Sequence, residues 1–132
     1  TEKVSNMKNK IQADQAPQAI GPYSQAIRTG NVVYFSGQIP LDPNTMALVA
    51  DDFAKQATQV FANLVEVCKA AGGSLEAIVK LTIYLTDLAH FPIVNEVMMQ
   101  FFSEPYPART TLQVSALPKN AQIEIEAIMV ME

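Results

Sequence analysis

The sequence predicts an α+β fold in which a single mixed β-sheet carries two helices on one face. The expected elements follow the order strand, strand, helix, strand, helix, strand, strand, and this order suits one sheet with crossovers on the same side. Two segments place apolar residues at helical spacing. The other expected elements alternate apolar and polar residues, as strands with one buried face do. Residues 1–132 are expected to form one domain, because this length suits a single hydrophobic core.

The N-terminal part of the chain is expected to lead through a loop into a β-hairpin. Residues 1–10 are polar, and they are expected to be flexible or to form a short edge strand. Gly21-Pro22 marks a loop, because proline disfavours helix at the residue before it. Thr29-Gly30-Asn31 joins two strands, the second of which covers Val32–Ile39. Gly37, near the end of that strand, predicts a bulge or a close approach of another group to the backbone.

The middle of the chain is expected to contain both helices, with a strand between them. Apolar spacing predicts the first helix over about 52–71, and Gly72-Gly73 should end it. The next strand, 78–86, should turn one set of side chains to the core: Val79, Leu81, Ile83 and Leu85. The second helix should cover about 91–103, with Pro92 in its first turn, where proline removes no intrahelical donor.

The last third of the chain is expected to form two further strands joined by a turn. In the first, 107–114, alternation puts Arg109 and Thr111 on one face. In the second, 122–130, Glu124 and Glu126 lie opposite an apolar face. If these strands are close in one sheet, an arginine and a glutamate share the face that no helix covers. A guanidinium can hold a carboxylate through two parallel hydrogen bonds, and a carboxylate can orient a water or move a proton.

The sheet face without helices is expected to be half polar and half apolar. It should carry Arg109, Thr111, Lys80 and both glutamates beside apolar side chains such as Ile128. A surface of this kind often marks an interface or a binding site. The sequence therefore predicts a homo-oligomer with sites on or beside the subunit contacts.

Composition narrows the classes of function. Nine Lys and Arg against thirteen Asp and Glu give a formal net charge of −4, which makes nucleic-acid binding unfavourable. The single cysteine favours a reducing cytoplasm, and no apolar run approaches the roughly 20 residues that span a bilayer. One histidine and one cysteine supply too few ligands for a metal site, so no metal or cofactor is predicted. Cys68 should be a small core residue, and His90 a solvent-facing or capping residue.

Taken singly, the candidate site residues have ordinary structural interpretations. Arg109 could form a surface or interface salt bridge with Glu124 or Glu126, or it could bind an anionic small molecule. Tyr23 could be a packed loop aromatic, and Asn95 could be a polar surface residue near the start of the second helix. No single residue decides between these interpretations.

Six short motifs, however, occur in one order along the chain. They are Ile20–Ala26, Phe35–Ile39, Val94–Val97, Tyr106–Arg109, Leu117–Lys119 and Ile123–Ala127. Together they resemble the Rid (YjgF) family, the reactive-intermediate imine/enamine deaminases, from about residue 10 to the C-terminus. The resemblance implies a chorismate-mutase-like α+β fold and a homotrimer with three clefts between subunits.

The resemblance also implies a reaction and a set of site residues. The reaction is that of a 2-iminobutanoate/2-iminopropanoate deaminase, which hydrolyses reactive 2-imino and 2-enamine acids, such as 2-aminoacrylate, to 2-keto acids and ammonia. Arg109 would bind the substrate carboxylate, and Glu124 would orient the attacking water. The remaining residues implied to bind substrate are Tyr23, Ser36, Gly37, Asn95 and Thr111. Many members carry a cysteine at the position of Thr111, so thiol chemistry is not expected there.

Two other functions stay open at this point. A non-catalytic protein could use the same cleft to bind or sense keto acids or small carboxylates. The family has also carried translation-inhibitor and ribonuclease labels, which predict an affinity for RNA that falls steeply with salt. The acidic composition argues against the second alternative.

Overall fold

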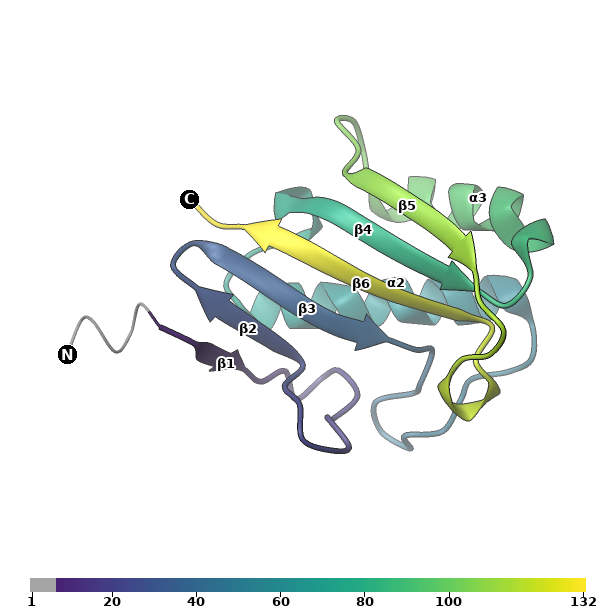
Figure 1. Ribbon diagram of the computed structural model, residues 1–132, viewed down its shortest axis with the longest axis horizontal. Helices are drawn as coiled ribbons and strands as arrows, with labels where there is room; N and C mark the ends of the chain where they lie inside the picture. The colour runs from purple at the N-terminus through teal and green to yellow at the C-terminus, as the bar shows by residue number, and fades with distance from the viewer. Residues whose placement is uncertain (1–6) are drawn as a thin grey trace.

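The computed structural model describes residues 7–132 and has two layers, a β-sheet and a layer of helices (Figure 1). The elements are β1 (Asn9–Ile11), β2 (Ala26–Thr29), β3 (Val32–Gln38), α2 (Phe53–Ala70), β4 (Ile78–Leu85), α3 (Phe91–Phe101), β5 (Ala108–Gln113) and β6 (Ile123–Val130). Three short 3-10 helices are η1 (Leu75–Ala77), η2 (Leu88–His90) and η3 (Pro118–Asn120). The strands form one six-stranded sheet in the order β1-β2-β3-β6-β4-β5. The predicted α+β fold class is confirmed.

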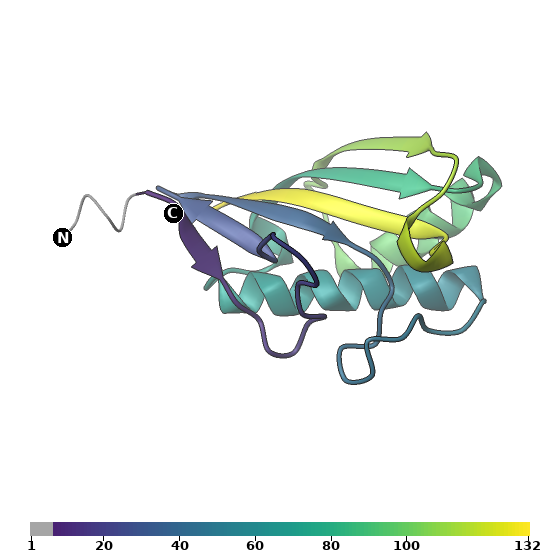
Figure 2. The same cartoon turned by 60° about the horizontal axis from the view of Figure 1, so that its bottom comes forward.

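The sheet is mixed, and both long helices lie on one side of it (Figure 2). The pair β4–β5 is parallel, and the other neighbours in the sheet are antiparallel. Of the N-terminal segment predicted to be flexible or an edge strand, residues 1–6 lie outside the described part of the chain. Asn9–Ile11 form the edge strand β1, which pairs with β2.

Helix α2 follows the predicted apolar stripe closely. The Asp52 side chain caps it by accepting a hydrogen bond from the Lys55 backbone N–H at 3.2 Å. It ends where Gly72 takes a φ of +89°, a value that glycine adopts without steric cost. The buried stripe includes Phe61, Leu64 and Cys68. Burial raises the pKa of the Cys68 thiol to about 12, so this cysteine is an inert core residue as predicted.

The predicted burial of one residue of β4, Val79, is wrong. Leu81, Ile83 and Leu85 are fully buried against the helices, whereas Val79 is 48% exposed. The pairing with β6 shifts register between Ile78 and Lys80, so a bulge turns Val79 outward and puts Ile78 into the core. Simple alternation cannot anticipate such an irregularity.

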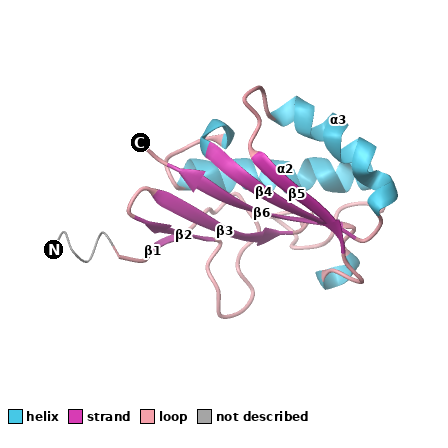
Figure 3. Cartoon of the chain, turned by 45° about the horizontal axis from the view of Figure 1, so that its top comes forward, coloured by secondary structure: helices cyan, strands magenta, loops and turns pink. Residues whose placement is uncertain are grey.

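The predicted placement of β5 side chains is also wrong in an important way. In the parallel β4–β5 pair, Arg109 stands opposite Leu81 and Thr111 opposite Ile83. Paired residues point to the same side of a sheet, so Arg109 and Thr111 face the helix layer. Strand β5 lies at the edge of the sheet, beside α3 (Figure 3). Glu124, which pairs with Tyr84, points to the uncovered face instead. The predicted shared face of Arg109 and Glu124 therefore does not exist within one chain.

Candidate functional site

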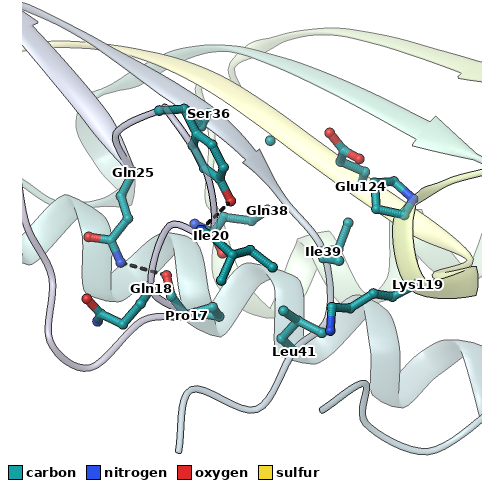
Figure 4. A pocket seen from close by; sticks show the side chains of 13 residues that line it. Pro17, Gln18, Ile20, Gln25, Ser36, Gln38, Ile39, Leu41, Lys119 and Glu124 are labelled. Atoms are coloured by element: carbon teal, nitrogen blue, oxygen red, sulfur yellow. Dashed lines mark hydrogen bonds between the residues drawn. The ribbon is translucent and has the colours of Figure 1, made fainter. Parts of the chain in front are cut away.

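All the predicted site residues except Thr111 line one of two separate cavities. Tyr23, Ser36, Gly37 and Glu124 line a cavity of about 460 Å³, which we call the glutamate half-site (Figure 4). Asn95 and Arg109 line a second cavity of about 490 Å³, the arginine half-site, together with Met98, Met99, Tyr106 and Pro107. Thr111 lines neither cavity.

A bulge in β3 shapes the glutamate half-site. The register between β3 and β6 shifts between Phe35 and Gln38, and Gly37 lies inside this shift. A β-carbon at Gly37 would stand only 2.8 Å from the carboxyl carbon of Glu124. Glycine therefore lets the carboxylate lie against the strand backbone, and the predicted bulge with a close approach is confirmed. Ser36 is fixed beside it, since its hydroxyl donates to the Ser24 carbonyl at 2.5 Å.

The loop that carries Tyr23 forms another wall of the glutamate half-site. The Tyr23 hydroxyl accepts a hydrogen bond from the Ile20 backbone N–H at 3.4 Å, and Tyr23 is half exposed. The buried Gln25 side chain holds this loop by accepting from the N–H of Ala13 and donating to its carbonyl. It also donates to the Pro17 carbonyl (Figure 4). Sequence reasoning missed this role of Gln25, which depends on contacts with residues 8 and 12 positions away in the sequence.

Burial and a like charge perturb Glu124. Both the burial of its carboxyl and the neighbouring Glu126 raise the pKa of Glu124 above its ordinary value. Glu126 itself accepts a hydrogen bond from the Tyr84 hydroxyl. This hydrogen bond is the main cause that raises the pKa of Tyr84 to about 12. A carboxyl with a raised pKa accepts a proton more readily near neutral pH, as a general base must.

Helix α3 orients the guanidinium in the arginine half-site. Nη1 of Arg109 donates to Oδ1 of Asn95 at 2.8 Å and lies 3.5 Å from the sulfur of Met98. Its Cζ lies 4.9 Å from the ring centroid of Phe91, a cation–π distance. Sequence reasoning missed Phe91 as part of the site. The spacing i, i+4 and i+7 of Phe91, Asn95 and Met98, which puts them on one helix face, was the available signal.

Arg109 is a partly buried cation without a carboxylate partner in the described part of the chain. Burial lowers the pKa of Arg109, but an arginine remains protonated at neutral pH. The ion pair found within residues 7–132 joins Lys69 to Glu66. The alternative in which Arg109 forms a salt bridge with Glu124 or Glu126 is therefore not observed between residues of one chain.

Three further observations complete the description of the site. The hydroxyl of Thr111 is buried and bonds to no other described residue, so its role in binding stays a prediction. Among residues 7–132, no group of three or more His, Cys, Asp or Glu side chains is arranged to hold a metal ion. The same residues contain no helix with the length and apolarity to cross a membrane.

Comparisons with known proteins agree over nearly the whole chain. A family model described as endoribonuclease L-PSP matches residues 13–131. The 2-iminobutanoate/2-iminopropanoate deaminase of Dermatophagoides farinae is 45% identical over 125 residues, which cover 95% of this chain and 98% of that protein. The crystal structure of RidA from the Antarctic bacterium Psychrobacter sp. superposes with a TM-score of 0.90 at 52% identity and covers 93% of this chain and 99% of its own. Escherichia coli TdcF with bound serine superposes with a TM-score of 0.90 at 44% identity, covering 95% and 100%.

Proposed function

The chain belongs to the Rid/YjgF family, and from this membership we propose that it hydrolyses 2-imino and 2-enamine acids, such as 2-aminoacrylate, to 2-keto acids and ammonia. The relative from Dermatophagoides farinae is named a deaminase of 2-iminobutanoate and 2-iminopropanoate. The related TdcF structure holds serine, the amino acid whose dehydration gives 2-aminoacrylate. A small acid with an α-carboxylate is therefore the substrate class that we infer.

The observation that carries this proposal is the unpaired guanidinium of Arg109. A partly buried charge without a partner is costly, and an anionic ligand would remove that cost. Asn95 and Phe91 hold the guanidinium, and only its Nη1 donates to described residues, so Nε and Nη2 are available to a ligand in the cavity that Arg109 lines. A guanidinium held in this way can bind a carboxylate in a bidentate manner.

We propose that the two half-sites meet between neighbouring copies of the chain in a homotrimer. Arg109 lies on the helix side of the sheet edge and Glu124 on the uncovered face, so one chain does not bring them together. A head-to-tail contact, repeated around a ring, would join the arginine half-site of each protomer to the glutamate half-site of the next. Exposed apolar side chains stand at both half-sites, and such a contact would cover them: Ile20 and Tyr23 at one, Met99 and Tyr106 at the other.

In the proposed reaction Arg109 binds the substrate carboxylate and Glu124 handles the water. Water attacks the carbon of the protonated imine while Glu124 accepts a proton from it, and a C–O bond forms. Glu124 then gives this proton to the nitrogen and takes the proton of the new hydroxyl as the C–N bond breaks, so that ammonia leaves and the keto group forms. Neither a metal nor a covalent intermediate is needed, because the protonated imine is already electrophilic. Positioning the reactants can lower such a barrier by several kcal/mol, and proton transfer contributes about 10²- to 10⁴-fold.

A direct assay tests the proposed function. A dehydratase acting on serine would generate 2-aminoacrylate in the cuvette, and ammonia and pyruvate would be followed with and without the protein. We expect the protein to accelerate the release of ammonia and of pyruvate, and the two products to form in equal molar amounts. Keto-acid binding without any acceleration would instead support the non-catalytic alternative.

The ribonuclease named in the family description makes a different prediction. Binding of a single-stranded RNA would have to overcome a formal net charge of −4. We expect no RNA retention in a filter assay at physiological salt. Tight retention that weakens steeply as salt rises would favour the ribonuclease function.

A cytoplasmic location is proposed from the cysteine content. Cys68 is the single cysteine of the sequence, and it is buried on α2. A chain that forms no internal disulfide suits a reducing compartment.

Replacing Gly37 with alanine is expected to damage the glutamate half-site. The added β-carbon would overlap the Glu124 carboxylate and displace it from its place against β3. We expect kcat/KM to fall by about 10²-fold, the effect of misplacing a reacting group by about 1 Å. The matched control is Gly30→Asn, at the other end of β3, where φ is +61° and nothing lies nearby. Asparagine tolerates this conformation, so the control should keep full activity.

A further inference from the structure

We propose that Tyr84 is a positioning residue for the reaction, since its hydroxyl fixes the Glu126 carboxylate beside Glu124 and so keeps Glu124 ready to accept a proton. The kinetic part of this inference rests on the proposed function. The contacts that carry it lie on the uncovered face of the sheet, and they can be tested without substrate.

The first step in the argument is the register of β4 and β6. Tyr84 is the cross-strand partner of Glu124, whereas Thr82 is the partner of Glu126. The Tyr84 hydroxyl nevertheless donates to Oε1 of Glu126, so the tyrosine side chain lies diagonally across two rows of the sheet. The backbone of Tyr84 is thus paired with Glu124, while its hydroxyl reaches the neighbouring cross-strand pair and binds Glu126.

The second step concerns the other charged groups near the two carboxylates. The Lys80 ammonium bonds to Thr82 Oγ1 at 3.1 Å, Thr110 Oγ1 at 3.2 Å and the Leu81 carbonyl at 3.3 Å, and it forms no ion pair with any residue from 7 to 132. Lys119, on η3, lines the same cavity as Glu124 but forms no ion pair with it.

The remaining titratable group of the cavity is Tyr23, whose hydroxyl accepts a hydrogen bond from Ile20. Among residues 7–132, Tyr84 is thus the only side chain that hydrogen-bonds to either Glu124 or Glu126. It is the described side chain that fixes the position of the Glu126 carboxylate beside Glu124.

The third step is the electrostatic consequence. The hydrogen bond from the Tyr84 hydroxyl holds the Glu126 carboxylate in one position beside Glu124. Burial is the larger cause and the charge of Glu126 the smaller cause that raise the pKa of Glu124. Without the hydroxyl, the Glu126 carboxylate would be free to turn toward solvent, where its field at Glu124 is screened. The pKa of Glu124 would then fall, and Glu124 would become a weaker base.

The kinetic test uses Tyr84→Phe, which keeps the ring and removes only the hydroxyl. We expect the acidic limb of the kcat/KM profile for imine hydrolysis to move to lower pH. Glu126→Gln should move it in the same direction, and Tyr84→Phe should have no further effect in the Glu126→Gln background. The control is Tyr34→Phe, because Tyr34 is a half-exposed tyrosine on the same uncovered face. Tyr34→Phe should leave the acidic limb of the kcat/KM profile at the same pH as in the wild type.

A second readout does not depend on activity. The side-chain carboxyl of Glu124 would be titrated by NMR in protein labelled with ¹³C-glutamate, and Glu124→Gln would identify its signal. The midpoint should fall in Tyr84→Phe and stay unchanged in Tyr34→Phe. An unchanged midpoint in Tyr84→Phe, or shifts that add fully in the double variant, would overturn the proposal. If the protein failed to hydrolyse imines while this midpoint moved, the proposed function would fall and the positioning role of Tyr84 would remain.

Discussion

Replacing Arg109 with alanine should lower kcat/KM for 2-iminobutanoate hydrolysis by about 10²- to 10³-fold, the cost of truncating one partner of a buried, hydrogen-bonded charge pair. The reason is that no other described cation lines the arginine half-site, so the substrate carboxylate would lose its partner. Ammonia release under kcat/KM conditions would measure the effect. Circular dichroism and sedimentation would show whether the variant keeps its fold and assembly.

Two companion variants sharpen this prediction. Arg109→Lys keeps the charge but loses the planar fork that can bind a carboxylate in a bidentate manner and stack on Phe91, so it should also be strongly impaired. Arg28→Ala removes the only other arginine, which donates to the Gly30 carbonyl in the β2–β3 turn. That variant should retain wild-type activity. An Arg109→Ala protein with normal kcat/KM would show that the carboxylate is bound elsewhere.

Sequence periodicity located the elements well where one face carries a continuous apolar run. The stripe of α2 identified the helix and its ends, because Asp52 caps it and Gly72 stops it. The turn at Gly30 between β2 and β3 is likewise local chemistry. Val79 was misplaced because a bulge between Ile78 and Lys80 interrupts the alternation of β4. Such a bulge depends on the pairing with β6 and leaves no local signal.

The faces of β5 could not be predicted in the same way. Its residues Ala108–Gln113 carry no continuous apolar run, so alternation separates two sets of side chains without telling which set faces α3. The pairing of Arg109 with the buried Leu81 decides this, and that pairing is a tertiary fact. Sequence motifs identified Arg109 and Glu124 as candidates. Their placement on opposite sides of the sheet, and so the proposed division of the site between protomers, required the structure.

This division makes a second strong prediction, which concerns mixed oligomers. Arg109→Ala and Glu124→Gln homo-oligomers should each be nearly inactive, because each lacks one half-site. Subunits of the two variants, unfolded together and refolded as a mixture, should regain activity wherever an intact Arg109 of one subunit meets an intact Glu124 of the next. Ammonia release by the mixture, compared with that of each parent treated alike, would measure the recovery.

The size of the recovery distinguishes the possible geometries. In a head-to-tail ring of three with random 1:1 mixing, every mixed trimer has one site with both residues intact, so about a quarter of the wild-type sites should return. Wild type mixed with the double variant Arg109→Ala/Glu124→Gln gives the matched control, since only sites between two wild-type neighbours stay active and about a quarter of the wild-type sites should again remain. A site built within one chain would give no recovery at all from the two single variants, and that result would contradict the proposed assembly. The separation of Arg109 and Glu124 across the sheet is the physical reason to expect recovery.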